Sequence, residues 1–511
     1  MLSKGLRLQA SSATKTYASQ EEDEQIVMKY QELIENQRRL SKEYEKTLDR
    51  RNSVEGLVTK IELLEKELAR ASAFFRQEQA VAKIDNQAVQ NSLKEGEAAI
   101  EFVHFQYQSS KSTDSILYAA AILLPNSSNA SFIPLCNEQQ LAQVLETKRS
   151  KKVNLINQVY AARGIIPTGK KKNFQQIYRL VWQPLDSLLS GVNTIYYSPT
   201  GLLHRLNMNA LPIGNKQILA DKYNLIQLSS TRSIALEKTE RPENKTAYIV
   251  GGVTYDAMIS TPSELITFDS TQITLAENTG YFSYTDRSLR GEHWNYLPGT
   301  KKESSAIKKI TEKAGYTITY QEGNAATEAA FKELGTKSQS PSVIHLATHG
   351  FFFPDVKDSL RAQSKEPIFK ISEHPMLRSG LLLAGANRVW EGAEALPDHE
   401  DGILTAMEIS QMNLSNTDLV VLSACETGLG DIQGSEGVYG LQRAFKKAGA
   451  KYLIMSLWQV PDKETSIFMT SFYNNWLKKK MSIPEAFNLT QKEMRDRFPN
   501  PYQWAGFVLI E

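Results

Sequence analysis

A histidine and a cysteine occupy corresponding places in two apolar segments of this chain. His349 lies near the end of Val-Ile-His-Leu-Ala-Thr-His-Gly (343–350), and Cys425 lies near the end of Leu-Val-Val-Leu-Ser-Ala-Cys-Glu-Thr-Gly (419–428). Each segment predicts a short buried strand that ends in a polar turn. A thiol beside an imidazole can lose its proton and become a nucleophile. If the two strands are parallel neighbours, the pair has the chemistry of a Cys-His peptidase.

Such chemistry also needs donors for a tetrahedral oxyanion, and the backbone can supply them. Gly350 has no side chain, so its N–H can approach a substrate carbonyl closely, and the N–H of Cys425 is the natural second donor. Taken singly, Cys425 would more often be a buried structural thiol and His349 a core histidine. His345 lies deeper in the same strand and is expected to pack in the core. A metal site that uses His345 and His349 is disfavoured, because residues four apart share a face on a helix but not in a turn after a strand.

The segments around this pair predict an α/β protein in which strands and helices alternate. Three strands, 343–347, 419–424 and 452–457, are almost entirely apolar, as expected for central strands covered on both faces. Ligands of open α/β sheets bind at the carboxyl ends of the strands, which is where both residues fall. The other predicted strands are 98–107, 116–124, 131–134, 194–201, 247–251, 316–320, 380–383 and 506–510, and the predicted helices are 138–160, 173–190, 302–314, 326–335, 435–448, 463–478 and 484–497.

The chain divides into four predicted regions. Residues 1–19 are expected to be a disordered leader, and residues 20–85 repeat apolar side chains at helical spacing, which predicts an arm of two helices. The arm is interpreted mainly as a packing element, with a dimerising coiled coil as the alternative. An α/β half is predicted over 86–238, and the half that carries the pair over 246–511. Residues 354–402 form a long polar insertion around the strand at 380–383, which is expected to be functional or disordered.

Composition narrows the class of protein. The 511 residues include 59 Lys and Arg against 57 Asp and Glu, a net charge of +2, so no basic field indicates nucleic acid. Only two cysteines are present, Cys136 and Cys425, which indicates a reducing, cytoplasmic setting rather than a disulfide framework. The longest apolar run, Ile116 to Leu124, is too short to cross a bilayer, so no membrane association is expected.

Several motifs of the chain resemble those of the CHAT domain, a group of caspase-like cysteine peptidases that are similar to separase and are often fused to tetratricopeptide repeats. The resemblance covers roughly residues 90–511. It is carried by His-Leu-Ala-Thr-His-Gly (345–350), Leu-Ser-Ala-Cys-Glu-Thr-Gly-Leu-Gly (422–430), Gly-Ser-Glu-Gly-Val-Tyr-Gly-Leu-Gln-Arg-Ala-Phe (434–445) and Ser-Leu-Trp-Gln-Val-Pro-Asp (456–462), and upstream by 196–204, 228–233 and Leu-Pro-Gly-Thr (297–300).

This resemblance implies a caspase–haemoglobinase fold with a pseudo-caspase half (86–238) and an active caspase-like half (246–511), preceded by the helical arm. In the first half, His204 lacks a partner cysteine in a strand-end motif. In the second half, Cys425 would be the nucleophile, His349 the general base and acid, and the N–H groups of Gly350 and Cys425 the oxyanion hole. No metal or organic cofactor is implied.

The resemblance also implies where a substrate binds and what it is. The strand that ends at Trp458 would pair with the substrate backbone. Specificity does not transfer with the resemblance. From the residues of this chain themselves, Glu436, Asp462 and Glu464 would line the first subsite and favour Arg or Lys before the scissile bond, while Asp462 would equally cap a helix that starts at Lys463. The substrate would be a protein, with a gasdermin-like or other operon partner in a bacterial defence or cell-death system as the family precedent.

One departure from the family pattern and two alternative functions are open. Residues 1–85 lack the tetratricopeptide repeat pattern, so a repeat-containing partner or another activator is expected upstream or on a separate chain. Two further functions are consistent with the residues: a catalytically silent scaffold that holds a partner, and a hydrolase of small acyl substrates that uses the same pair. An extended groove would favour protein substrates, and a closed pocket would favour small ones.

Overall fold

The computed structural model describes most of the chain and both strands that lead to the candidate pair. The described residues are 24–44, 54–71, 84–109, 112–125, 127, 129–145, 176–213, 217–236, 244–256, 293–336, 338–353, 367–396, 399–424, 431–432, 438–458 and 460–511. The predicted leader, most of the linker before the second half, Cys425 and Glu436 lie outside them.

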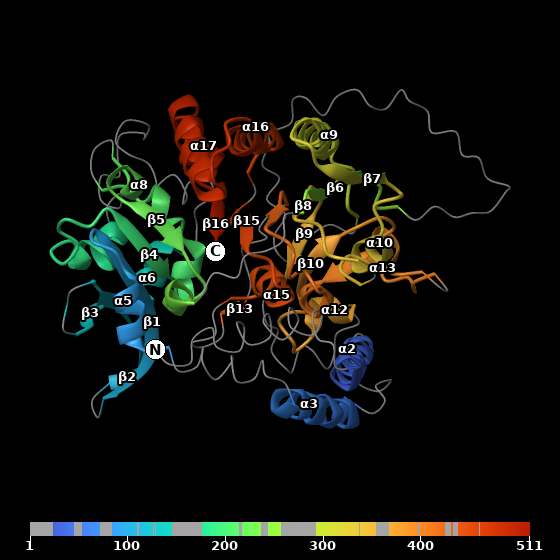
Figure 1. The fold of residues 1–511 in the computed structure, drawn as a ribbon, viewed down its shortest axis with the longest axis horizontal. Helices are drawn as coiled ribbons and strands as arrows, with labels where there is room; N and C mark the ends of the chain where they lie inside the picture. The colour runs from blue at the N-terminus through green and yellow to red at the C-terminus, as the bar shows by residue number, and fades with distance from the viewer. Residues whose placement is uncertain are drawn as a thin grey trace.

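Eleven strands form one mixed sheet that runs through both predicted halves (Figure 1). The predicted mixed α/β class is therefore confirmed. Strands β1 and β2 are antiparallel, whereas β6, β8, β12 and β15 are parallel neighbours. In sheet order the strands are β3 (Ser131–Asn137), β2 (Ser112–Leu123), β1 (Glu97–Ser109), β4 (Thr194–Ser198), β5 (Asn224–Gln227), β16 (Phe507–Ile510), β15 (Tyr452–Ser456), β12 (Leu419–Leu422), β8 (Val343–Leu346), β6 (Thr246–Val253) and β7 (Thr317–Gly323).

The central strands are parallel and buried because they have almost no polar side chains to place in water. Every residue of β8 and β12 is buried, and so are all residues of β15 except Tyr452. Helices α9 (Pro298–Lys313), α16 (Asp462–Tyr473) and α17 (Ile483–Arg497) lie along one side of the sheet, with α15 (Leu441–Ala448) on the other (Figure 1). Gly251 in β6 allows the close approach of α9, because a Cβ there would lie 2.3 Å from the Ser304 Oγ.

The shorter helices and turns are distributed around these layers. The predicted helix at 173–190 is irregular where it is described, because Pro184 interrupts the backbone hydrogen bonds. The short helices are α5 (Asn86–Ser92), α6 (Glu138–Leu145), α8 (Leu219–Lys222), α10 (Glu328–Lys332), α12 (Ile368–Ile371), α13 (Asn387–Trp390) and α14 (Ala406–Gln411). Single turns of 3-10 or π-helix are η2 (Tyr178–Trp182), η3 (Gln183–Leu185), η4 (Gly201–Arg205), η5 (Met208–Ala210), η6 (Thr231–Ala235), η10 (Asn474–Lys478) and η11 (Pro501–Gln503).

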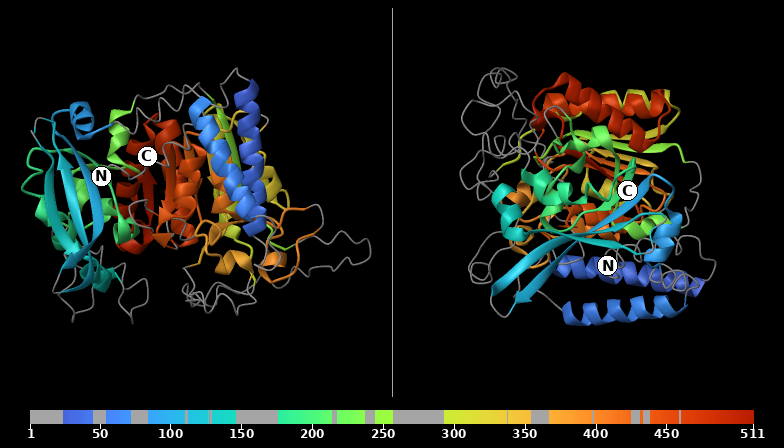
Figure 2. Two further views of the ribbon diagram at one scale, coloured as in Figure 1. Left: turned by 90° about the horizontal axis from the view of Figure 1, so that it is seen from below. Right: turned by 90° about the vertical axis from the view of Figure 1, so that its left-hand side faces the viewer.

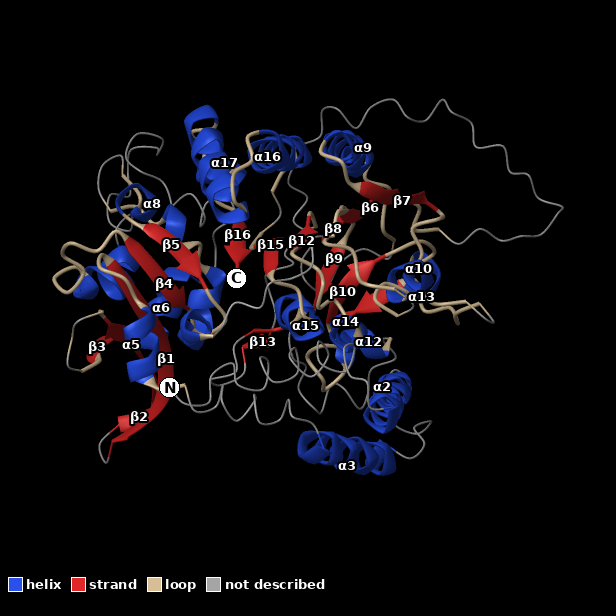
Figure 3. Cartoon of the chain, in the orientation of Figure 1, coloured by secondary structure: helices blue, strands red, loops and turns tan. Residues whose placement is uncertain are grey.

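The polar insertion contains more regular structure than its sequence predicts. Its strand β10 (Ser379–Leu382) lies between β9 (Gly350–Phe352) and β11 (Ile403–Thr405) in a separate antiparallel sheet (Figure 3). A two-stranded pair, β13 (Asp431–Ile432) with β14 (Val438–Tyr439), was not predicted either. Strands this short have too few residues to show an alternating pattern, which explains why β9 and β11 were missed.

The helical arm consists of α2 (Glu24–Tyr44) and α3 (Val54–Ala71), which lie side by side (Figure 2). Lys29 pairs with Glu67 at 3.1 Å and Glu32 with Lys60 at 2.7 Å, so the two helices run antiparallel. The Gln411 side chain of α14 donates to the Gln37 carbonyl of α2 at 3.1 Å, so the arm packs on the body. Among the helices of the described segments, none is both long and apolar enough to cross a bilayer.

Candidate active site

The parallel pair β8 and β12 brings its two carboxyl ends to the same edge of the sheet. Leu422 is the register partner of Leu346, and the Ser423 N–H donates to the Leu346 carbonyl at 2.9 Å. His349 follows Leu346 by three residues, and Cys425 follows Leu422 by three residues. Ala424 is the last described residue before Cys425, and it is buried.

The His349 ring is held by a backbone carbonyl and two aromatic side chains. Its Nε2 lies 2.9 Å from the Asn295 carbonyl oxygen. Because a carbonyl can only accept, Nε2 carries the proton and Nδ1 keeps a lone pair. The ring centroids of Trp294 and Tyr255 lie 4.6 and 5.0 Å from that of His349. This arrangement leaves Nδ1 as the basic atom of the ring.

The same surroundings keep the imidazole uncharged. Burial lowers the pKa of His349 from 6.5 to about 4, and the hydrogen bond to the Asn295 carbonyl opposes this change. The cause is desolvation of the charged form by the packed rings. At neutral pH His349 is therefore a neutral base.

The Gly350 N–H points away from the neighbouring strand. The Leu382 N–H donates to the His349 carbonyl at 2.9 Å, and the Phe353 N–H donates to the Arg378 carbonyl at 2.7 Å. In an antiparallel ladder the hydrogen-bonded pairs alternate, so Gly350 and Leu381 form a non-hydrogen-bonded pair. The Gly350 N–H is accordingly not used by β10, as an oxyanion donor requires.

A small cavity lies at the carboxyl ends of these strands. It has a volume of about 30 Å³, room for about one water molecule. The Ser456 Oγ donates to the Ala424 carbonyl at 2.6 Å, and the buried Ser423 hydroxyl has no hydrogen-bond partner among the described residues. The lining residues are Leu297, Gly299, Thr300, Glu303, Thr348, Ser423, Ala424, Ser456, Val460, Asp462, Thr465 and Phe507.

Asp462 is the acidic residue of the predicted subsite that lines this cavity. Desolvation and the nearby Glu303 carboxylate raise the pKa of Asp462. The alternative role as a helix cap is wrong, because α16 begins at Asp462 itself, after Pro461, without a side-chain cap. Glu464 is buried and accepts from the Gln503 side chain at 2.8 Å, so its carboxylate is already engaged.

The Trp458 side chain belongs to the protein core. Its side chain is buried, and its Nε1 donates to the Tyr502 carbonyl at 3.0 Å. Strand β15 has β12 on one side and β16 on the other, and the Leu457 N–H donates to the Gly506 carbonyl. Between Tyr452 and Leu457 the strand is therefore interior, and a substrate backbone could pair only with residues from Trp458 onward.

His345 packs in the core, as its place in the strand predicts. It is fully buried, with Nε2 3.1 Å from a Glu303 carboxylate oxygen and Nδ1 3.3 Å from the Tyr473 hydroxyl. In the first half, Cys136 is buried on β3, and burial raises the pKa of its thiol to about 11. A thiol with that pKa stays protonated at neutral pH, so it is a poor nucleophile.

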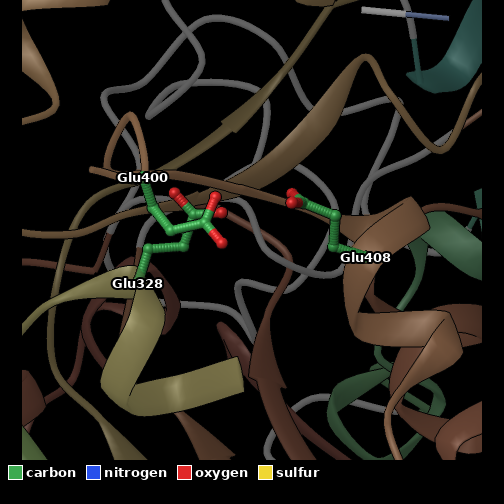
Figure 4. Close-up of side chains that lie close together, drawn as sticks. All are labelled: Glu328, Glu400 and Glu408. Carbon is green, nitrogen blue, oxygen red and sulfur yellow. The ribbon is translucent and has the colours of Figure 1, made fainter. Parts of the chain in front are cut away.

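A separate group of carboxylates resembles a cation site (Figure 4). Oxygen atoms of Glu328, Glu400 and Glu408 lie within 4.8 Å of one another, and Figure 4 shows the three side chains converging. The Lys332 ammonium lies 3.1, 2.9 and 2.8 Å from these three carboxylates. The lysine thus supplies the positive charge, and the group is an ion-pair network between α10, α14 and the segment before β11.

Sequence reasoning missed the residues that hold His349. Tyr255, Trp294, Asn295 and Asn387 lie far from it in the sequence and form no local motif. The nearest signal was Leu-Pro-Gly-Thr (297–300), which begins two residues after Asn295. Only the fold shows that α9 begins within this motif and that the backbone just before it, at Asn295, contacts the His349 imidazole.

Comparison with known proteins identifies one family over most of the sheet. The family profile described as CHAT domain matches residues 171–511, so β1 to β3 lie outside the match. The mouse and human proteins named tetratricopeptide repeat protein 28 are 35% and 33% identical to this chain over 123 residues, 24% of its length. That match spans only 5% of the length of each of these relatives.

Two kinds of solved structure are similar to the chain at low identity. The Arg specific cysteine proteinase gingipain R is 10% identical, with a TM-score of 0.36 over 72% of this chain and 69% of that one. Separase in the Saccharomyces cerevisiae separase–securin complex is 9% identical, with a TM-score of 0.41 over 89% of this chain and 33% of that one. Scores this low carry no argument about the present site.

Proposed function

This chain belongs to the CHAT domain family, and on that premise we propose that it is a cysteine endopeptidase. Cys425 is the nucleophile and His349 the base in this proposal. The observation that carries it is the matched register of β8 and β12: Thr348 and Ala424, the residues just before the pair, line one cavity. A scaffold protein needs neither a neutral, oriented imidazole nor a glycine N–H that the neighbouring strand β10 leaves unused.

The reaction follows from the atoms available. The Nδ1 of His349 takes the thiol proton as the Cys425 sulfur bonds to the peptide carbonyl carbon. The N–H groups of Gly350 and Cys425 stabilise the oxyanion, which collapses as the C–N bond breaks and the imidazolium protonates the leaving amine. His349 then deprotonates a water molecule, which attacks the thioester, and the protonated imidazole returns the proton to the departing thiolate.

We propose that the first subsite takes Arg or Lys. Asp462 lines the cavity beside Thr348 and Ala424, and Glu303 adds a second carboxylate to the same lining. A cationic side chain would offset both the desolvation and the repulsion by Glu303 that raise the pKa of Asp462. A hydrolase of small acyl substrates that uses the same pair is the second candidate, and the map of new protein N-termini described below distinguishes it from an endopeptidase.

The partners are inferred from the family. We propose a protein substrate in a reducing compartment and a regulatory partner, and we take the defence role, with a gasdermin-like protein as one candidate substrate, from the resemblance of the motifs. The matched relatives are named as tetratricopeptide repeat proteins, which supports a repeat-containing partner. We propose that residues 86–238 form the half without a catalytic pair, in agreement with the protonated thiol of Cys136.

The test is a map of new protein N-termini, by mass spectrometry, in a lysate incubated with purified protein. Wild type is expected to generate cuts after Arg or Lys that Cys425→Ala and His349→Ala do not generate. The control Cys136→Ala should cut as wild type does, and Asp462→Asn should lose the basic preference. Identical termini with wild type and Cys425→Ala would contradict the proposed function.

A further inference from the structure

Asn387 is a buried polar residue that belongs to the insertion and not to the strands of the site. It is the first residue of α13, within residues 354–402, and its side chain is 2% exposed. A buried amide must find partners for its oxygen and both N–H groups, otherwise it destabilises the fold. The positions of these partners show what Asn387 does.

The Asn387 side-chain amide forms hydrogen bonds with the backbone on one side of His349. The Asn387 Oδ1 accepts from the Trp294 N–H at 2.8 Å, and the Nδ2 donates to the Trp294 carbonyl at 3.0 Å. The second Nδ2 proton is directed to the Asp256 carboxylate at 2.9 Å. One amide thus pairs with Trp294 as a neighbouring strand would, and the next residue, Asn295, supplies the carbonyl that fixes the His349 tautomer.

The backbone of Asn387 holds the other side of His349. Its N–H donates to the Tyr255 carbonyl at 2.9 Å. The Tyr255 hydroxyl accepts from the His349 N–H at 3.3 Å and lies 2.9 Å from the Thr348 Oγ1. Trp294 and Tyr255, the two aromatic walls of the imidazole, are therefore both held by contacts with Asn387. The same helix supplies Trp390, whose ring lies 5.0 Å from that of Trp294.

We propose that Asn387 is a positioning residue for His349, through which the position of α13 sets the tautomer and burial of the imidazole. This inference rests on the proposed function, because it assigns His349 the role of base. When α13 is seated, Trp294 and Tyr255 enclose the ring and the Asn295 carbonyl selects the Nε2–H tautomer. When α13 is displaced, both walls lose their anchor and the ring is hydrated and free to change tautomer.

The readout must report on His349 itself, so that it does not depend on cleavage. We would record long-range 1H–15N spectra of protein labelled with 15N-histidine between pH 7.5 and 5.5, with His349→Gln to assign the signal. Wild type is expected to show a protonated Nε2 and an unprotonated Nδ1 throughout. Asn387→Ala should show averaged shifts and protonation as the pH falls. The titratable groups around Asn387 are Asp256, His293 and Glu391, and all remain in this variant.

A matched control variant distinguishes the positioning role of Asn387 from the general effect of removing a buried side-chain amide. Asn475 is also 2% exposed and donates to Thr490 and Glu493 of α17 at 2.9 and 3.1 Å. Asn475→Ala should lower stability but leave the His349 spectrum as in wild type. Cleavage by Asn387→Ala should fall on the order of 10²-fold in kcat with little change in KM, as for a misplaced catalytic group.

Each outcome of these experiments supports or overturns the positioning role of Asn387. Unchanged His349 shifts in Asn387→Ala, or equal changes in Asn475→Ala, would overturn it. If Asn387→Ala does not fold, Asn387→Asp keeps the size and the acceptor for the Trp294 N–H but loses both donors, and the same spectral change is expected. If the His349 shifts change in Asn387→Ala but even the wild-type protein cleaves nothing, the positioning role of Asn387 is supported and the proposed peptidase function is contradicted.

Discussion

The charge state of one imidazole decides how the proposed nucleophile is activated. With the pKa of His349 lowered to about 4 by burial, the ring is neutral at pH 7 and its Nδ1 is ready to accept a proton. The resting pair is then a thiol and an imidazole, and the thiolate forms as the substrate is attacked. An ion pair formed before substrate binds would need a protonated ring, which the packing of Trp294 and Tyr255 disfavours.

This charge state predicts the pH dependence of thiol reactivity. The rate of alkylation of Cys425 by iodoacetamide, followed by peptide mass spectrometry, should rise through the ordinary thiol pKa of about 8.5 and be low at pH 5. Cys136 should stay unmodified over this range, because burial raises its pKa to about 11. A plateau of Cys425 reactivity at pH 5 that His349→Gln abolishes would contradict the neutral pair.

At the scale of elements, strand ends could be predicted and the surroundings of the imidazole could not. The apolar runs around His345, Val420 and Leu453 predicted β8, β12 and β15, because central parallel strands have a strong compositional signal. Tyr255, Trp294 and Asn387, which surround or hold the His349 ring, come from three separate segments. No local sequence pattern predicts that Asn387 contacts Trp294. Of the acidic residues proposed for the first subsite, Asp462 lines the cavity, whereas Glu464 is engaged by Gln503.

The ion-pair network of Lys332 joins the insertion to the main sheet. Its carboxylate partners come from α10, from α14 and from the segment before β11, and Glu328 is only 2% exposed. Desolvation raises the pKa of Glu328, with the neighbouring Glu408 carboxylate as the next cause, and Lys332 opposes both. Removal of the ammonium would leave the buried Glu328 and the neighbouring Glu408 without the opposite charge that offsets their repulsion, which is strongly destabilising.

Lys332→Met should therefore lower the free energy of unfolding by about 3–5 kcal/mol, measured by urea denaturation. The matched control is Lys479→Met, because Lys479 pairs with Glu493 at an exposed position, with side chains 53% and 39% exposed. An exposed pair of this kind contributes at most about 1 kcal/mol. Equal losses in the two variants would show that the network does not hold the insertion in place.

At the scale of the whole molecule, the C-terminal strand joins the two predicted halves. Strand β16 is antiparallel to β15 and parallel to β5, where Ile510 is the register partner of Gln227. The Asn207 side chain donates to the carbonyls of Ala505 and Phe507 at 2.9 and 3.1 Å. One apolar core extends from β1 to β16. The sheet that orients His349 is thus completed by the last residues of the chain.

The most direct test of the central claim is covalent labelling of the two cysteines. We would treat the protein at pH 7 with a lysyl acyloxymethyl ketone, which alkylates an activated thiol that recognises the lysine, and quantify both cysteine peptides by mass spectrometry. The account predicts an adduct on Cys425, strongly reduced in His349→Ala and in Asp462→Asn, and none on the buried Cys136. Equal labelling of Cys425 with and without His349 would contradict it.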